Sequence, residues 1–139
     1  MLKNMSTSTD RRNNFRVYFT YAISADAHFK FINGQVVDLD KTISLLILDL
    51  SSTGMKMETA LDLPSDIDLI LQIEFKIENE PIKLYGKALW KKILSPVKIN
   101  YGLEFIHFKE CEQMKLVRCL NIYQIKQRRL GKVKSIPKS

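Results

Sequence analysis

Short runs of alternating apolar and polar residues are the feature that most constrains how this chain can fold. Between residues 15 and 105, apolar side chains recur at every second position in successive segments, which is the period of a half-buried β-strand. Turn signals separate the segments, and Asn33-Gly34 between apolar runs is the strongest short hairpin signal among them. Asn79-Glu80-Pro81 and Ser95-Pro96 supply later turns. We therefore expect the middle of the chain to be antiparallel β-structure.

The expected strands lie between these turns. They are Phe15 to Ile23, Phe29 to Phe31, Ile43 to Leu48, Met55 to Met57, Ile67 to Ile77, Ile82 to Trp90 and Ile99 to Phe105. In the sixth of these, Trp90 falls on the same face as Leu84 and Ala88. A lone Trp in that register is more often a core residue than a stacking platform for a base, so we assign Trp90 a structural role.

The pattern becomes helical from Lys109 to about Leu130, and Gly131 is a suitable C-cap. The expected apolar stripe of this helix comprises Met114, Val117, Leu120, Ile122, Tyr123 and Ile125. Several short strands followed by one helix indicate a mainly β fold, a closed or partly closed barrel with a C-terminal α-helix packed on it or near it. We divide the chain into a flexible arm (1–10), a β-domain (11–108), a helix (109–131) and a basic tail (132–139).

Length and composition restrict the class of protein. A chain of 139 residues fits one domain, and 45% hydrophobic residues suffice to bury a core. The N-terminus has no apolar segment of the secretory kind, and no apolar run reaches the roughly 20 residues of a membrane-spanning helix. The net charge of +7 arises after Glu112, where eight basic residues and no acidic residue occur. We expect a cytoplasmic protein without a transmembrane segment.

The residues that commonly carry catalysis or bind metals are sparse. Cys111 and Cys119, eight residues apart on the expected helix, would lie roughly 12 Å apart, too far for a disulfide. His28 and His107 are the two histidines, and no spacing suits a metal site. Ser51 lacks the surroundings of a hydrolase nucleophile. We expect no catalytic residue, no metal and no cofactor.

Two local features carry a binding chemistry. Arg11, Arg12 and Arg16 precede or begin the first strand, and a guanidinium matches a phosphate or the O6/N7 edge of guanine in bidentate fashion. The turn Asp49–Gly54 (Asp-Leu-Ser-Ser-Thr-Gly) adds a carboxylate, hydroxyls and a glycine that permits close backbone approach or positive φ. Taken alone, the Arg cluster is also typical of a solvated basic arm, and the turn residues are favoured for purely local reasons. Composition leaves these alternatives open.

The two features together resemble the PilZ domain family. PilZ domains pair an Arg-x-x-x-Arg motif with a downstream Asp/Asn-x-Ser-x-x-Gly motif, which Arg12–Arg16 and Asp49–Gly54 match in the right order. Gly86–Trp90 (Gly-Lys-Ala-Leu-Trp) and Tyr101–Phe105 (Tyr-Gly-Leu-Glu-Phe) resemble the late strands of the family. The resemblance extends over about residues 11 to 108.

This resemblance implies a six-stranded antiparallel β-barrel of Greek-key or split type that binds cyclic di-GMP. Arg12 and Arg16 would contact phosphates and guanine edges, Asp49 and Ser51 would hydrogen-bond a guanine, and Gly54 would keep the wall of the site open. An Arg at the position of Arg11, just before the first motif, is compatible with a stacked pair of ligands.

Our leading hypothesis is therefore a cyclic di-GMP receptor or adaptor that changes conformation on binding and signals to a partner protein in motility, surface polysaccharide or biofilm control. One alternative is a β-barrel nucleic-acid-binding protein, in which the Arg cluster and the basic tail follow a phosphate backbone; we consider nucleic acid the less favoured ligand because the tail lacks interleaved aromatic residues. The other alternative is a PilZ-like interaction module that does not bind the nucleotide.

Overall fold

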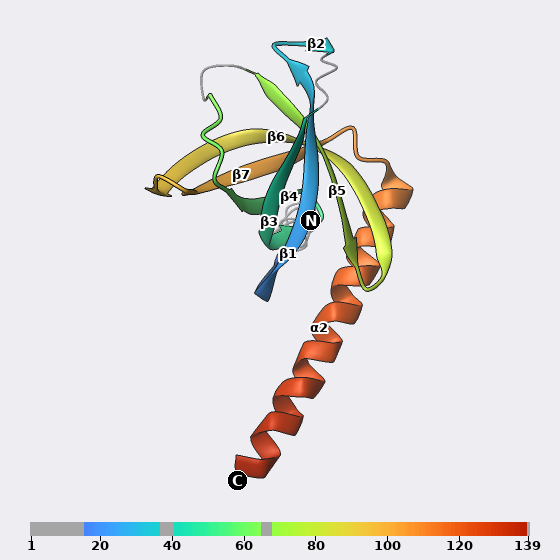
Figure 1. Ribbon diagram of the computed structural model, residues 1–139. Coiled ribbons are helices and arrows are strands. Elements are labelled where there is room, and N and C mark those ends of the chain that lie inside the picture. The colour runs from blue at the N-terminus through green and yellow to red at the C-terminus, as the bar shows by residue number, and fades with distance from the viewer. Residues whose placement is uncertain (1–15, 37–40, 65–67, 139) are drawn as a thin grey trace, which may run out of the picture.

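The computed structural model of the chain describes residues 16–36, 41–64 and 68–138. Its elements in chain order are β1 (Arg16–Ile32), β2 (Gln35–Val36), β3 (Thr42–Ser51), β4 (Gly54–Thr59), β5 (Leu69–Ile77), β6 (Glu80–Ser95), β7 (Lys98–Ile106) and α2 (Glu110–Lys138), as Figure 1 shows. The expected flexible arm (1–10), with Arg11 and Arg12, lies outside these described residues.

Six long strands form a ring-like sheet within the described part of the chain. The strand order is β2-β1-β3-β4-β7-β6-β5, every neighbouring pair is antiparallel, and an additional pairing of β1 with β5 joins the two ends of the order. Strand β2 is a two-residue addition that pairs with the end of β1. The expected mainly β architecture of six antiparallel strands with a C-terminal helix is confirmed.

The Asn-Gly hairpin is confirmed at the end of β1. Asn33 and Gly34 have φ angles of 52° and 82°, and a two-residue turn with both central residues at positive φ matches the twist of the flanking strands. The two strands expected from the pattern before this turn are one continuous strand, β1.

A bulge in β1 breaks the alternation expected for its first half. Tyr18 pairs with Asp49, but the next pair is Ile23 with Ile47, so four residues of β1 lie opposite Leu48 alone. Regular alternation in the strand expected from Phe15 to Ile23 would place Tyr21 on one half-buried face with Val17 and Ile23. This is wrong, because the extra residues carry the Tyr21 side chain outward to 84% exposure.

The apolar side chains inside the ring form one core, to which every long strand contributes. The largest fully buried members include Tyr101, Ile47, Leu50, Met55, Met57, Leu71, Ile73, Ile82, Leu84 and Ile99. The Tyr101 hydroxyl reaches the chain between β4 and β5, where it donates to the Leu61 carbonyl at 2.7 Å and accepts from the Leu63 amide at 2.7 Å. Burial raises the pKa of Tyr101, which keeps this phenol protonated as a donor.

Helix α2 extends the core with a face that matches the expected stripe only in part. Leu116, Cys119 and Leu120 are buried, at spacings of three and four residues, and Tyr123 packs against the core. Leu120 and Tyr123 were expected in the stripe, whereas its members Met114, Ile122 and Ile125 are exposed. Burial raises the pKa of the free Cys119 thiol.

The helix also continues beyond the expected C-cap. It runs through Gly131 to Lys138, so the expected boundary at 131 is wrong and the residues expected as a basic tail are helical in backbone as far as 138. Gly is a preferred C′ residue but not an obligatory stop, because its helix-interior cost is only about 1 kcal/mol.

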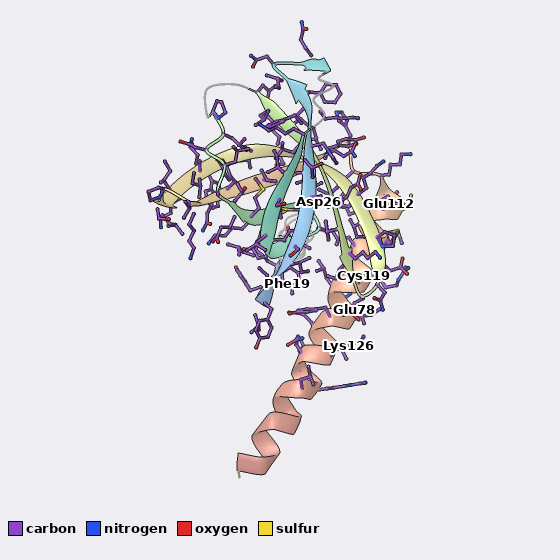
Figure 2. The ribbon with its side chains drawn as sticks, viewed as in Figure 1. Phe19, Asp26, Glu78, Glu112, Cys119 and Lys126 are labelled. Atoms are coloured by element: carbon purple, nitrogen blue, oxygen red, sulfur yellow. The ribbon has the colours of Figure 1, made fainter. Side chains whose placement is uncertain are left out.

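Helix α2 contacts the ring beside β1 and the β5–β6 hairpin and then extends away from it (Figure 1). The rings of Phe19 and Tyr123 meet edge to face with centroids 5.0 Å apart, and Lys126 pairs with Glu78 at 2.6 Å. Figure 2 labels Phe19, Glu78 and Lys126 along this contact, with Cys119 between the helix and the sheet. Among the described helices, none is long and apolar enough to span a membrane.

Candidate functional site

Antiparallel pairing brings the two sequence motifs together. Strand β1 begins at Arg16 and β3 ends at Ser51, and the register pairs Arg16 with Ser51 and Tyr18 with Asp49. Arg16, the last residue of the Arg motif, therefore lies beside the Asp49–Gly54 turn, although Arg16 and Asp49 are separated by more than thirty residues in the chain. Of the expected site residues, Arg16, Asp49, Ser51 and Gly54 are described and gather here, while Arg11 and Arg12 lie outside the described residues.

Arg16 and Asp49 form the charged centre of this site. The Arg16 Nη1 donates to Asp49 Oδ1 at 2.5 Å, and the same oxygen accepts the backbone amide of Lys56 at 3.1 Å. The Asp49 side chain is only 6% exposed, whereas the Arg16 side chain is 32% exposed. The buried carboxylate thus orients a guanidinium whose outer part reaches solvent, and an Arg held in this way is prepared to bind an anion.

Ser51 organises the turn that follows β3. Its Oγ accepts hydrogen bonds from the amides of Thr53 at 3.2 Å and Gly54 at 3.1 Å, and Arg16 Nη2 lies 3.4 Å from it. The same oxygen lies 3.2 Å from the Gly54 carbonyl, to which it can donate its proton. Ser51 is completely buried, so its hydroxyl is engaged inside the turn.

Gly54 allows β4 to approach β7 closely. A Cβ added to Gly54 would lie 2.4 Å from the Leu103 carbonyl oxygen, well inside van der Waals contact. Among described glycines, positive φ occurs only at Gly34, so close approach, and not the left-handed region, explains the glycine at position 54. The Thr53 carbonyl accepts the Phe105 amide at 2.8 Å beside this contact. The turn is thereby tied to β7.

A row of side chains extends the site across the outer face of the sheet. The register places Tyr18, Asp49, Lys56, Gly102 and Trp90 next to one another on β1, β3, β4, β7 and β6. At about 4.8 Å per strand, the four steps of this row cover roughly 19 Å along the sheet. We call these five residues the outer row. Lys56 and Tyr18 were not expected as site residues, because only the strand register reveals their position.

Trp90 is not the core residue that the alternation predicted. Its side chain is 47% exposed and lies against Gly102, where an added Cβ would meet the indole nitrogen at 2.0 Å. The reason is a bulge at Leu89: Ala88 pairs with Leu103 and Trp90 with Gly102, so the inward and outward faces of β6 exchange at this point. The absence of a side chain at Gly102 then gives the indole room against the sheet.

The site is connected to helix α2. Gln113, in the first turns of the helix, donates from Nε2 to the Ser52 carbonyl at 2.9 Å. Together with the Phe19–Tyr123 contact, this bond attaches α2 to the turn and to the bulged part of β1. A cleft of about 770 Å³ lies away from the site, between β1 and the β5–β6 hairpin. None of the four described motif residues lines this cleft.

A small antiparallel ring that joins an Arg at the start of β1 to an Asp-x-Ser-x-x-Gly turn is the arrangement of one known class of β-domain. The family model for the PilZ domain matches residues 10–121, and the chain belongs to this family. No curated protein matches the sequence.

Solved structures show the same fold at low sequence identity. The PilZ domain of CeSA from a cellulose-synthesizing bacterium is 10% identical with a TM-score of 0.57, and the match covers 80% of this chain and 99% of that one. The PilZ domain of YcgR from Escherichia coli, solved with c-di-GMP, is 12% identical with a TM-score of 0.61 and coverage of 85% and 95%. The longer YcgR structure with c-di-GMP has a TM-score of 0.59, and the match covers 49% of that chain.

Proposed function

We propose that this chain is a cyclic di-GMP receptor that binds the nucleotide beside the start of β1. The observation that carries the proposal is the Arg16–Asp49 pair, which joins the two PilZ motifs at the surface of the ring. The ligand presents two phosphodiesters and two guanines, and a guanidinium suits both groups. The solved PilZ domain of YcgR contains this nucleotide, which supports the same ligand class here.

The proposed roles of the site residues follow from their exposure. Arg16, the partly exposed member of the pair, contacts a phosphate or a guanine edge, and the buried Asp49 holds its guanidinium in place. Arg11 and Arg12, which precede β1 in sequence, add further donors. Ser51 and Gly54 act through the shape of the turn, because both are buried.

The outer row enlarges this site with aromatic surfaces. Tyr18 is 72% exposed and Trp90 is 47% exposed, at opposite ends of a row whose centre contains Asp49 and Lys56. Base stacking on an aromatic side chain contributes about 1–3 kcal/mol per base. We assign Trp90 a stacking role at the far end of the site and Lys56 a role beside a phosphate.

The proposed output is a change in the surface near α2. Ordering the Arg11–Arg12 segment over the ligand costs conformational entropy, which the new contacts must offset. Because Gln113 bonds the Ser52 carbonyl, a shift of the turn alters the position of the helix start. We propose that a cytoplasmic partner protein reads this change, in a process such as motility or surface polysaccharide control.

Calorimetric titration with cyclic di-GMP, alongside GTP, tests the proposed ligand. We expect a dissociation constant near or below about 1 μM, roughly −8 kcal/mol, with at least tenfold weaker GTP binding. The Arg12→Ala, Arg16→Ala double variant should lose binding. Arg16→Lys should weaken it more than tenfold while retaining a positive charge beside Asp49, because Lys lacks the planar fork. Arg128→Ala, Arg129→Ala on the exposed part of α2 is the matched control and should bind normally.

The same titration tests the roles of Arg11 and Trp90. Two ligands per chain, reduced to one in Arg11→Ala, are expected if Arg11 supports a stacked pair. Trp90 is the only tryptophan of the chain, so its fluorescence reports ligand arrival at the outer row directly. If the folded chain does not bind cyclic di-GMP, the result would favour a protein-interaction module. Salt-sensitive binding of RNA or DNA without nucleotide selectivity would favour a nucleic-acid-binding protein.

A further inference from the structure

The β6–β7 hairpin carries an apolar tip far from the motif turn. The two strands remain paired as far as Ser95 with Lys98, so the hairpin ends in the two residues Pro96 and Val97. Figure 1 shows this tip projecting from the ring on the side away from the start of α2. Ile93 is 58% exposed, Leu94 47% and Val97 72%, so three large apolar side chains meet solvent at one end of the molecule.

The apolar surface continues around the tip and is not limited to one face. Ile93 pairs with Ile99, a core residue, so it lies on the inner face of the sheet. Leu94, the next residue, and Val97, in the turn, are exposed as well, so the apolar surface is not confined to the face of Ile93. A medium that surrounds the tip covers both faces.

Positive charge accompanies the apolar residues. The sequence contains no acidic residue between Glu80 and Glu104, and Lys92 and Lys98 are exposed immediately below the tip. Lys91, one position earlier, contacts Asp62 at 2.6 Å and the Leu63 carbonyl at 2.8 Å, which fixes the base of the hairpin to the chain between β4 and β5. The hairpin itself is therefore apolar at its end with two exposed lysines beside it, and the register places the acidic Glu58 of β4 opposite Asn100, one strand away from Lys92.

We propose that the β6–β7 tip docks on an anionic lipid bilayer surface. Ile93, Leu94 and Val97 enter the interfacial region, and Lys92 and Lys98 contact acidic headgroups. Amphipathic Lys side chains place an apolar stem beside lipid and the charge in the headgroup layer, and each cation near an anionic surface strengthens binding. An exposed apolar hairpin end with lysines beside it matches this two-layered chemistry better than a flat protein surface does.

The proposal does not depend on nucleotide binding, because the residues that would meet the bilayer belong neither to the Arg16–Asp49 pair nor to the outer row. These residues are Lys92, Ile93, Leu94, Val97 and Lys98. Docking by the tip leaves α2 on the other side of the ring from the bilayer (Figure 1). The surface linked to Ser52 through Gln113 then remains open to solvent.

Vesicle co-sedimentation of the full chain tests this proposal. The probes are phosphatidylcholine vesicles with and without about a third of phosphatidylglycerol, at millimolar lipid because the contact area is small. We expect binding to the anionic vesicles only. Leu94→Glu, Val97→Glu should reduce partitioning more than tenfold, and Lys92→Glu, Lys98→Glu should reduce it at least about fivefold for each lysine.

Matched variants separate the tip from other surfaces. Met114→Glu, Ile125→Glu places the same two new charges on exposed apolar residues of α2, and this variant should bind vesicles about as well as the wild type. Arg128→Ala, Arg129→Ala should likewise retain most of the binding, since these cations belong to the helix. Thermal unfolding and cyclic di-GMP titration of each variant show whether the fold and the nucleotide site persist.

Three outcomes would overturn the proposal. They are the absence of vesicle binding by the wild type, equal binding to neutral vesicles, and vesicle binding that survives Leu94→Glu, Val97→Glu but disappears with the helix arginines. The first would leave the tip as a surface for a protein partner, and the last would assign membrane contact to α2. Nucleotide binding without vesicle binding would refute docking and leave the proposed receptor function intact.

Discussion

Two turns of this molecule contain the same local hydrogen bond in opposite surroundings. Ser51 Oγ accepts the amide of Thr53 at 3.2 Å, and Ser95 Oγ accepts the amide of Val97 at 3.3 Å. The first serine is buried and also serves the Gly54 amide and the Arg16 side chain, whereas the second turn is exposed. The same hydrogen bond, from an amide to the serine hydroxyl two residues earlier, therefore stabilises a buried site in one turn and lies on an exposed surface in the other. Burial and additional partners make the difference.

The largest effect on stability is expected at Gly54, which follows the buried serine turn. A methyl group at Gly54→Ala would collide with the Leu103 carbonyl oxygen, a backbone atom that cannot rotate away. We expect a loss of about 2–3 kcal/mol in the free energy of unfolding, the range of overpacked sites, measured by urea denaturation. Gly86→Ala is the matched control, because its nearest neighbour is the Leu103 Cδ1 at 3.2 Å, a side-chain end that can shift. Equal losses in both variants would contradict the close-approach explanation.

A second, smaller effect is expected for the two serines. Ser51→Ala leaves the amides of Thr53 and Gly54 without this acceptor in a buried turn, and we expect a loss of about 2 kcal/mol in stability. Ser95→Ala removes the corresponding bond where water replaces it, so its effect should stay within about 0.5 kcal/mol. If the two substitutions cost the same in denaturant unfolding, burial does not distinguish the turns.

The smallest expected effect concerns the attachment of the motif turn to α2. Gln113→Ala removes the bond to the Ser52 carbonyl, and we expect a cost of about 0.5–1 kcal/mol because this bond is only partly buried. Gln127→Ala, an exposed glutamine of the same helix, should be neutral. A double-mutant cycle of Gln113→Ala with Ser51→Ala should show coupling of about 0.5 kcal/mol or more, and strict additivity would mean that the helix and the turn are independent.

Much of the fold followed from the sequence because strand periodicity and turn chemistry are local. The Asn33-Gly34 hairpin has the positive φ angles that its residues favour, and the alternation from Leu69 to Ile77 corresponds to one regular strand. The pairing of an Arg motif with an Asp-x-Ser-x-x-Gly motif also identified residues that meet in space. The family match over residues 10–121 agrees with that assignment.

The errors occurred where a local signal was overruled by distant contacts. The bulges at Phe19–Ala22 and Leu89 reversed the expected faces of Tyr21 and Trp90, because pairing with β3 and β7 determines where an extra residue is accommodated. On α2, Leu116 and Cys119 are buried although the expected stripe did not include them, whereas Met114 and Ile125 of that stripe are exposed. Sequence periodicity does not tell which strand a given strand will pair with, or which face of a helix will pack against the sheet.

By itself, the sequence determined the class of fold and the residue types of the candidate site, since both depend on short-range spacing and on chemistry that each side chain brings with it. The tertiary structure decided their surroundings. Ser51 is buried inside its turn, β7 lies close to Gly54, and the cross-strand register places Lys56 and Trp90 in one row with Asp49. These assignments depend on which backbone segments lie side by side, and a pattern along one segment cannot encode the distance to another.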